Sequence, residues 1–173
     1  MFKNVINIWK RVLPFSAKQP LYKLAAFYIL ALGSGLPFSQ TALADQAFDT
    51  NHAARLVWST MIAIEQANRT GNYSVLRDNS ASSFQQANNP ATLASLFERL
   101  RNTNFDLSNT LLLSPDYSIP PTVRKDGLLR MRGRFELRPT PVNFDLMFQL
   151  ESGKWRLFGI AVVAGNPNKQ AQK

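Results

Sequence analysis

The side chains of this sequence that are best placed for chemistry are four arginines. Arg130, Arg132, Arg134 and Arg138 fall in one stretch, residues 127–164, of a chain whose formal net charge is +9. Clustered guanidinium groups are typical of sites that bind phosphate or carboxylate, nucleic acid included. Arginine at every second position also fits another interpretation, in which the arginines form one face of a β-strand.

A second group of candidates consists of ionisable side chains that stand apart from one another. His52, the only histidine, lies at the start of a predicted helix, where a partly exposed cap residue is expected. Glu65 and Glu98 lie off the apolar stripes of predicted helices and are expected to be exposed. Four other residues are expected in loops, in solvated or capping roles: Tyr73, Arg77, Asp78 and Tyr117. The sequence positions no partner for any of them, as acid–base catalysis requires.

Several common catalytic and binding motifs are missing from the sequence. It has no Gly-rich phosphate loop, no metal-ligand spacing and no Ser-His-Asp arrangement. It also has no cysteine, which excludes disulfides and thiolate metal sites. The sequence therefore predicts no metal site and no cofactor, and no catalytic residue is assigned.

Residues 1–44 have the composition of a secretory signal peptide. Five basic residues and no acidic one precede the apolar run "LAAFYILAL", and Ala42-Leu43-Ala44 follows as a small-residue cleavage signal. We expect cleavage after Ala44, so that the mature protein begins at Asp45, is periplasmic or secreted, and keeps no membrane span. The alternative is a permanent N-terminal anchor, although the apolar run is shorter than the ~18 residues that a spanning helix needs.

Cleavage changes the meaning of the net charge. The mature chain keeps 15 basic residues against 11 acidic ones, a surplus of four. This surplus is too small to indicate nucleic-acid binding, which an exported protein rarely needs. We expect one domain over residues 45–165 and a disordered tail over residues 166–173.

The mature chain changes from helical to alternating periodicity. A helix is predicted over residues 50–72, a short helix or turn over 73–84, and a third helix that begins at Pro90 with Asn89 as its cap. After these, "NTLLLS" and "PDYSIPPTV" predict a strand and an edge strand, and "KDG" predicts a hairpin turn. Helices followed by antiparallel strands indicate an α+β fold with the helices packed on one face of a bent sheet.

Apolar alternation sets the predicted register of the last three strands. Two-residue turns at Pro139-Thr140 and Ser152-Gly153 are assumed. The inner face then pairs Met131 with Phe148, Gly133 with Leu146 and Phe135 with Phe144, followed by Leu157 with Phe148, Gly159 with Leu146 and Ala161 with Phe144. Because a one-residue slip would move every side chain to the other face, the pattern favours this register.

The same register places the arginines on the outer face of the sheet. Arg134 is predicted opposite Asp145, so the run is interpreted as a partly charge-paired strand face rather than a specific anion site. The outer face of the last strand is predicted to be apolar, and a monomer would leave it in water. We therefore expect a homodimer through this face, with an interface that contains Met147, Phe158, Ile160 and Val162 beside Arg132 and Arg134.

The order of elements and the C-terminal strands resemble the nuclear transport factor 2-like superfamily. The features that carry this resemblance are the phenylalanine-containing strand 143–150, the "ESGKWRL" hairpin and the closing strand "RLFGIAVV". The resemblance covers residues 53–164 and implies a cystatin-like cone. The superfamily includes isomerases, hydrolases, binding modules and assembly domains, so the fold alone does not decide the function.

The resemblance implies where a site would lie. Enzymes of this superfamily, such as ketosteroid isomerases and epoxide hydrolases, keep acids, bases or hydrogen-bond donors inside the cone, whereas the inner face predicted here has no titratable residue. We therefore expect an exported, noncatalytic domain that binds an apolar small molecule or associates with itself or a partner. The alternative is an isomerase or hydrolase that uses loop residues such as Tyr73 and Asp78. The residues that either line a ligand cavity or fill the core are Trp58, Phe97, Met131, Phe135, Phe144, Phe148 and Trp155.

Overall fold

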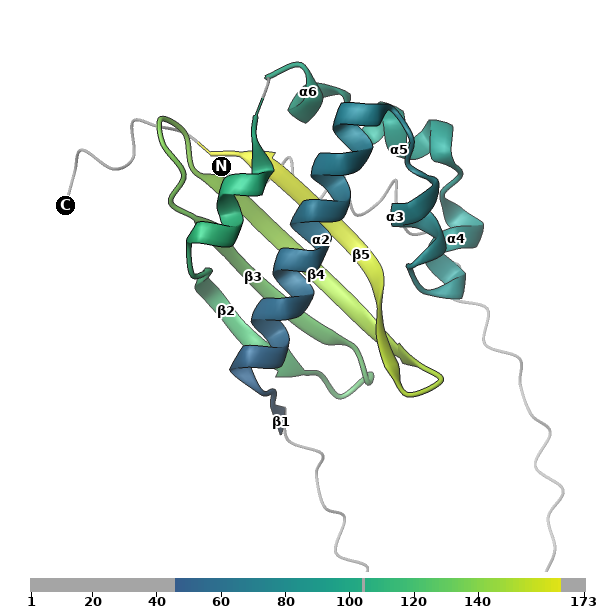
Figure 1. The fold of residues 1–173 in the computed structure, drawn as a ribbon. Helices are drawn as coiled ribbons and strands as arrows, with labels where there is room; N and C mark the ends of the chain where they lie inside the picture. The colour runs from purple at the N-terminus through teal and green to yellow at the C-terminus, as the bar shows by residue number, and fades with distance from the viewer. Residues whose placement is uncertain (1–45, 104, 166–173) are drawn as a thin grey trace, which may run out of the picture.

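The computed structural model describes residues 46–103 and 105–165, which form an α+β fold. One face of an antiparallel sheet is covered by a long helix, and shorter helices lie beyond one edge of the sheet (Figure 1). Helices followed by strands is the order that the sequence predicts, so this part of the prediction is confirmed. The predicted signal peptide, its cleavage point between Ala44 and Asp45, and the predicted tail lie outside the described residues.

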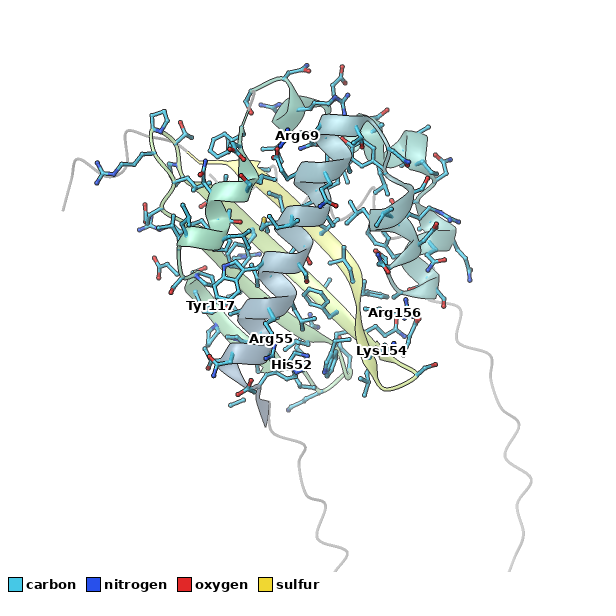
Figure 2. The ribbon with its side chains drawn as sticks, in the orientation of Figure 1. His52, Arg55, Arg69, Tyr117, Lys154 and Arg156 are labelled. Atoms are coloured by element: carbon cyan, nitrogen blue, oxygen red, sulfur yellow. The ribbon has the colours of Figure 1, made fainter. Side chains whose placement is uncertain are left out.

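The long helix α2 spans Thr50–Thr70. Asp49 caps its N-terminus by accepting a hydrogen bond from the His52 backbone N–H at 2.6 Å, and Gly71 ends it in the left-handed conformation. The helix runs from His52 and Arg55 near its first turn to Arg69 near its last (Figure 2). The prediction for residues 50–72 is therefore confirmed.

Four short helices follow α2. They are α3 (Ser74–Asp78), α4 (Ser82–Ala87), α5 (Pro90–Leu96) and α6 (Glu98–Arg101). Asn89 caps α5 by accepting from the Thr92 backbone N–H at 2.8 Å, as predicted. The Ala81 backbone N–H donates to the Leu157 carbonyl at 2.8 Å and so fixes the start of α4 at the edge of the sheet.

The segment predicted as a strand at "NTLLLS" is a 3-10 helix, η1, over Leu107–Leu112. Two carboxylates hold its first turn: Asp106 accepts from the Ser108 backbone N–H at 2.9 Å, and Glu65 of α2 accepts from the Leu107 backbone N–H at 3.0 Å. These hydrogen bonds fix the two residues just before the predicted strand. Within it, the Leu113 backbone N–H donates to the Thr110 carbonyl at 3.2 Å and so continues the helical turn instead of a ladder. The strand prediction was therefore wrong.

The sheet has the strand order β1-β2-β3-β4-β5, and every neighbouring pair is antiparallel. The strands are β1 (Gln46–Ala47), β2 (Asp116–Val123), β3 (Leu129–Phe135), β4 (Val142–Glu151) and β5 (Lys154–Ala164). The predicted turn at "KDG" joins β2 to β3, with Gly127 at a φ of +77°. β2 carries Pro120-Pro121 next to the edge of the sheet, where prolines do little damage.

The β3–β4 register differs from the prediction by two residues. Gly133 pairs with Phe144 and Phe135 with Val142, because β3 ends at Phe135 and residues 136–141 form a longer connection than the two-residue turn assumed. A shift of two keeps each side chain on its predicted face. At Gly133 a side chain is excluded, because an added Cβ would overlap the Asp116 backbone oxygen and lie 2.8 Å from Cζ of Phe144.

A β-bulge at Phe158 changes the second half of β5. Leu150 pairs with Trp155 and Phe148 with Leu157 as predicted, but Met147 then pairs with Gly159. The extra residue reverses the faces of everything that follows it. Ile160 and Val162 therefore point into the core, with exposed fractions of 1% and 6%, and not to the outer face as predicted.

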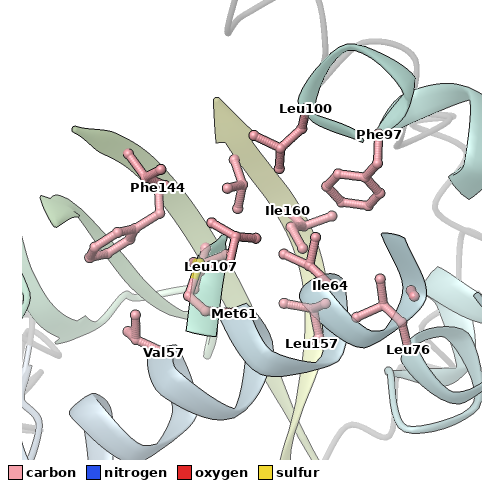
Figure 3. Packing of buried hydrophobic residues seen from close by; sticks show 14 of the residues in the cluster. Val57, Met61, Ile64, Leu76, Phe97, Leu100, Leu107, Phe144, Leu157 and Ile160 are labelled. Carbon is pink, nitrogen blue, oxygen red and sulfur yellow. The ribbon is translucent and has the colours of Figure 1, made fainter. Parts of the chain in front are cut away.

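The core lies between α2 and the inner face of the sheet (Figure 3). Val57, Met61 and Ile64 of α2 pack against Phe144 and Ile160 of the strands, and all five are buried. The short helices contribute residues such as Leu76, Phe97 and Leu100, so they close the core beyond β5. All of these core contacts lie within residues 46–165.

Candidate functional site

Most of the predicted cavity-lining residues are packed in the core. Phe97, Met131, Phe135, Phe144 and Phe148 have exposed fractions of 3% or less. The remaining two are partly buried: the Trp58 indole N–H donates to the Leu113 carbonyl at 3.1 Å, and Trp155 meets the ring of Phe48 edge-on. Each tryptophan therefore has a structural neighbour.

A shallow hollow of about 220 Å³ lies elsewhere, between α2 and α3. Its lining consists of Ala63, Gln66, Ala67, Thr70, Asn72 and Val75. None of these belongs to the predicted cavity set, and none carries an ionisable side chain. The hollow therefore has no side chain that could act as an acid, a base or a charged ligand.

Tyr117 places a polar group on the inner face of the sheet. It lies on β2 opposite Gly133, and its ring meets Phe144 edge-on with centroids 6.1 Å apart. Its hydroxyl is buried and has no hydrogen-bond partner among residues 46–103 and 105–165. Burial raises the pKa of Tyr117 to about 12. A neutral hydroxyl in such surroundings is a potential donor to an oxyanion. The prediction of a solvated or capping role for Tyr117 was wrong.

Glu65 is a buried carboxylate, with an exposed fraction of 7%, and not an exposed one as predicted. It lies on α2, and its described partner is the Leu107 backbone N–H at 3.0 Å. Burial of an acid without a partner would be costly, so this contact explains why it is tolerated. Glu98 is exposed, as predicted.

The other isolated candidates are engaged in local contacts. Tyr73 is fully buried, contrary to the prediction, and its hydroxyl donates to Asn68 Oδ1 at 2.6 Å and accepts from Arg101 at 2.9 Å. Arg77 pairs with the exposed Asp78 at 2.8 Å. The partly exposed His52 lies in the first turn of α2, where its ring lies 5.1 Å from that of Phe48, so its predicted position is confirmed. None of these contacts joins a base to a nucleophile.

Arg130, Arg132 and Arg134 lie on the outer face of β3 and are ion-paired, whereas Arg138 is exposed in the connection between β3 and β4. Asp145, with an exposed fraction of 2%, accepts from Arg130 at 3.1 and 2.9 Å and from Arg132 Nε at 2.9 Å. The hydrogen bonds to Asp145 raise the pKa of Arg130. Arg134 instead pairs with Asp116 at 3.2 Å and with Glu136.

This arrangement both confirms and corrects the sequence prediction. Arg130, Arg132 and Arg134 do form one charge-paired strand face, without Arg138. The carboxylate assigned to Arg134 is instead held by Arg130 and Arg132, because the register is shifted by two. Of the predicted interface residues, Met147 is buried at 8% and Phe158 is partly exposed. The other two apolar ones, Ile160 and Val162, belong to the core.

The alternation of polar and apolar residues is enough to predict which side chains of β3 and β4 lie on the outer face of the sheet. It does not predict the partners of Asp145, Glu65 and Tyr73. The Asp145 site depends on register, and the Glu65 and Tyr73 contacts depend on how α2, η1 and α6 pack. In β5 the size of the side chains could have predicted which of them face the core, since large Ile160 and Val162 alternate with small Gly159 and Ala161. Large side chains belong on the side that packs against helices.

Two structural features are absent from the described residues, 46–103 and 105–165. These residues contain no group of three or more His, Asp or Glu side chains arranged to hold a metal ion. Among their helices, none is both long and apolar enough to cross a bilayer.

No family model, curated protein or solved structure matches this chain.

Proposed function

We propose that this chain is an exported, noncatalytic domain that works through its surface, by association. The observation that supports this proposal is the packing of the inner sheet face. Leu129, Met131, Phe135 and Leu146 are fully buried there against the helices. A domain whose interior is filled in this way has no space there for a ligand, so its interactions with other molecules take place at its surface.

The same proposal describes the fold as a nuclear transport factor 2-like, cystatin-like cone. Its support is the order of elements, helices first and then an antiparallel sheet that ends in β5. The bulge at Phe158 and the close approach of Phe144 to Gly133 are features that bend a sheet around a helix. The resemblance stated from the sequence is consistent with both.

A small-molecule isomerase or hydrolase is the second candidate, favoured by one observation. The unpartnered hydroxyl of Tyr117 is a hydrogen-bond donor inside the fold. A reaction of this class also needs a base within hydrogen-bond reach of the substrate. The acid of the original hypothesis, Asp78, is exposed and pairs with Arg77, so the geometry supports the noncatalytic function better.

A test of the filled interior separates these functions. Met131→Trp adds volume at a fully buried position and should cost about 1–3 kcal/mol of unfolding free energy in a packed core. In a ligand cavity the same change would be tolerated and would displace the ligand. Native mass spectrometry of the protein from its own host should show no bound small molecule. A ligand that the Met131→Trp variant loses would refute the proposal.

Self-association through the outer sheet face is proposed as the mode of association. With Ile160 and Val162 in the core, the exposed apolar part that β5 contributes to this face is reduced to the partly exposed Phe158 and Val163. Analytical ultracentrifugation of the wild type should show a dimer that Phe158→Glu dissociates. Val75→Glu is the matched control, because Val75 is an exposed valine on α3 and should leave the dimer intact. A wild-type monomer at micromolar concentration would exclude the dimer.

A further inference from the structure

An aromatic cluster lies at the end of the molecule where α2 begins. The Phe48 ring lies between two others, 5.1 Å from His52 and 5.5 Å from Trp155 between centroids. Trp155 is the second residue of β5 and is paired with Leu150 of β4, so both point to the same side of the sheet. We call Phe48, His52, Leu150 and Trp155 the aromatic end.

The aromatic end is partly open to solvent. Leu150 has an exposed fraction of 53%, although two residues earlier on the same face Phe148 is exposed by only 3%. Phe48, His52 and Trp155 are each partly buried. The inner face of the sheet thus extends past its covering helix and leaves apolar surface in water.

Cations surround this surface. Lys125 is exposed in the turn between β2 and β3. Lys154 is exposed at the turn between β4 and β5, and Arg55 is exposed on α2 one turn after His52 (Figure 2). The acids nearby are already engaged: Asp49 caps α2, Asp126 pairs with Arg124 at 3.0 Å, and Glu151 accepts from the Ser82 backbone N–H at 3.0 Å. Asp49 and Glu151 keep their negative charges, whereas Asp126 is neutralised by Arg124. Arg55, Lys125 and Lys154 therefore leave this end with an excess of one positive charge over the two remaining carboxylates.

The chain enters the domain at the aromatic end. β1 pairs with Thr122 and Val123 of β2, next to the turn that carries Lys125, and Phe48 follows directly. The apolar run at residues 24–32 precedes Gln46 by a segment that spans at most about 45 Å when fully extended. Before any cleavage, a bilayer that holds this run is within reach of the aromatic end.

We propose that the aromatic end docks on an anionic lipid bilayer. Trp, Phe and Leu flanked by lysines are the residues that lie in the headgroup region of membranes, with the rings at the boundary and the ammonium groups at the phosphates. Docking on a bilayer is a different interaction from association between copies of the chain. It rests on the proposed export, which brings the chain to a membrane. The vesicle experiment below does not depend on export, so the two can fail separately.

The absence of cysteine from the sequence allows a site-specific test on the full chain. Leu150→Cys is labelled with an environment-sensitive fluorophore, and Leu112→Cys is the matched control, since Leu112 is an 81% exposed leucine on η1. With vesicles of phosphatidylcholine containing phosphatidylglycerol, the probe at position 150 should shift to the blue and the probe at position 112 should not. An equal shift at both positions, or none at 150, would overturn the proposal.

The lysines supply the second readout. Lys125→Gln and Lys154→Gln should each weaken binding to the phosphatidylglycerol vesicles by about fivefold. Arg99→Gln, at an exposed position on α6, should leave binding unchanged. Binding that ignores the lysines and equals that on pure phosphatidylcholine overturns the electrostatic part. A blue shift at position 150 that grows with protein concentration in the absence of vesicles would assign the aromatic end to a protein partner instead.

Discussion

Removal of both arginines that hold Asp145 should destabilise the fold much more than removal of either one. Asp145 is 2% exposed and lies on the outer face of β4, gripped by Arg130 and Arg132 from β3. In Arg130→Ala or Arg132→Ala, the carboxylate keeps one guanidinium. In the double variant it is left buried with neither cation.

The contacts give the size of each effect. A single variant loses charge-assisted hydrogen bonds but leaves Asp145 paired, so we expect a loss of about 1–2 kcal/mol. The double variant leaves a buried carboxylate without its partners, which costs about 3–5 kcal/mol. The two changes should therefore be non-additive by about 1 kcal/mol. Adding Asp145→Asn to the double variant should recover part of the loss, because no charge then remains buried.

Urea unfolding followed by tryptophan fluorescence measures all four variants. Arg99→Ala is the control, because Arg99 is exposed on α6 and should change the unfolding free energy by no more than about 0.5 kcal/mol. If the double variant costs no more than the control, the carboxylate is hydrated and the argument from burial fails. If the two single losses simply add, the arginines act separately and do not share Asp145.

Four further predictions concern Tyr117, the core phenylalanines and the N-terminus. Tyr117→Phe should leave the unfolding free energy unchanged or raise it by up to about 1 kcal/mol, because the lost hydroxyl has no partner; a clear loss would reveal one. Since the pKa of Tyr117 is raised from 10.0 to about 12, the wild type should lose stability as the pH rises from 10 toward 12, and Tyr117→Phe should lose less in urea titrations at the two pH values. Phe144→Ala and Phe148→Ala should each cost about 3–5 kcal/mol in urea unfolding, and near-neutral results would indicate an open pocket. If the leader is cleaved as proposed, N-terminal sequencing of the protein purified from its host should begin at Asp45, whereas an intact Met1 on a membrane-bound form would indicate an anchor.

The sequence by itself determined the elements whose signals are local. Asn89 and Pro90 mark the start of α5 through a cap and a fixed φ, and Gly127 permits the β2–β3 turn. Alternation assigned β3 and β4 to their correct faces even though the register was displaced by two. Period-two patterning reports the face of a strand, and it leaves open which residue lies opposite which.

Tertiary structure decided whatever depended on contacts between distant segments. The Leu107 backbone N–H meets Glu65, which lies on a different helix, so η1 forms where the local sequence favours a strand. In β5 nearly every residue from Leu157 to Val163 is apolar, and alternation there fits either face equally well. The bulge at Phe158 resolves this ambiguity by placing bulky Ile160 and Val162 against the helices and small Gly159 and Ala161 outside. The volume between the sheet and the helices determines which side chains of β5 face inward, and that volume is defined only in the packed fold.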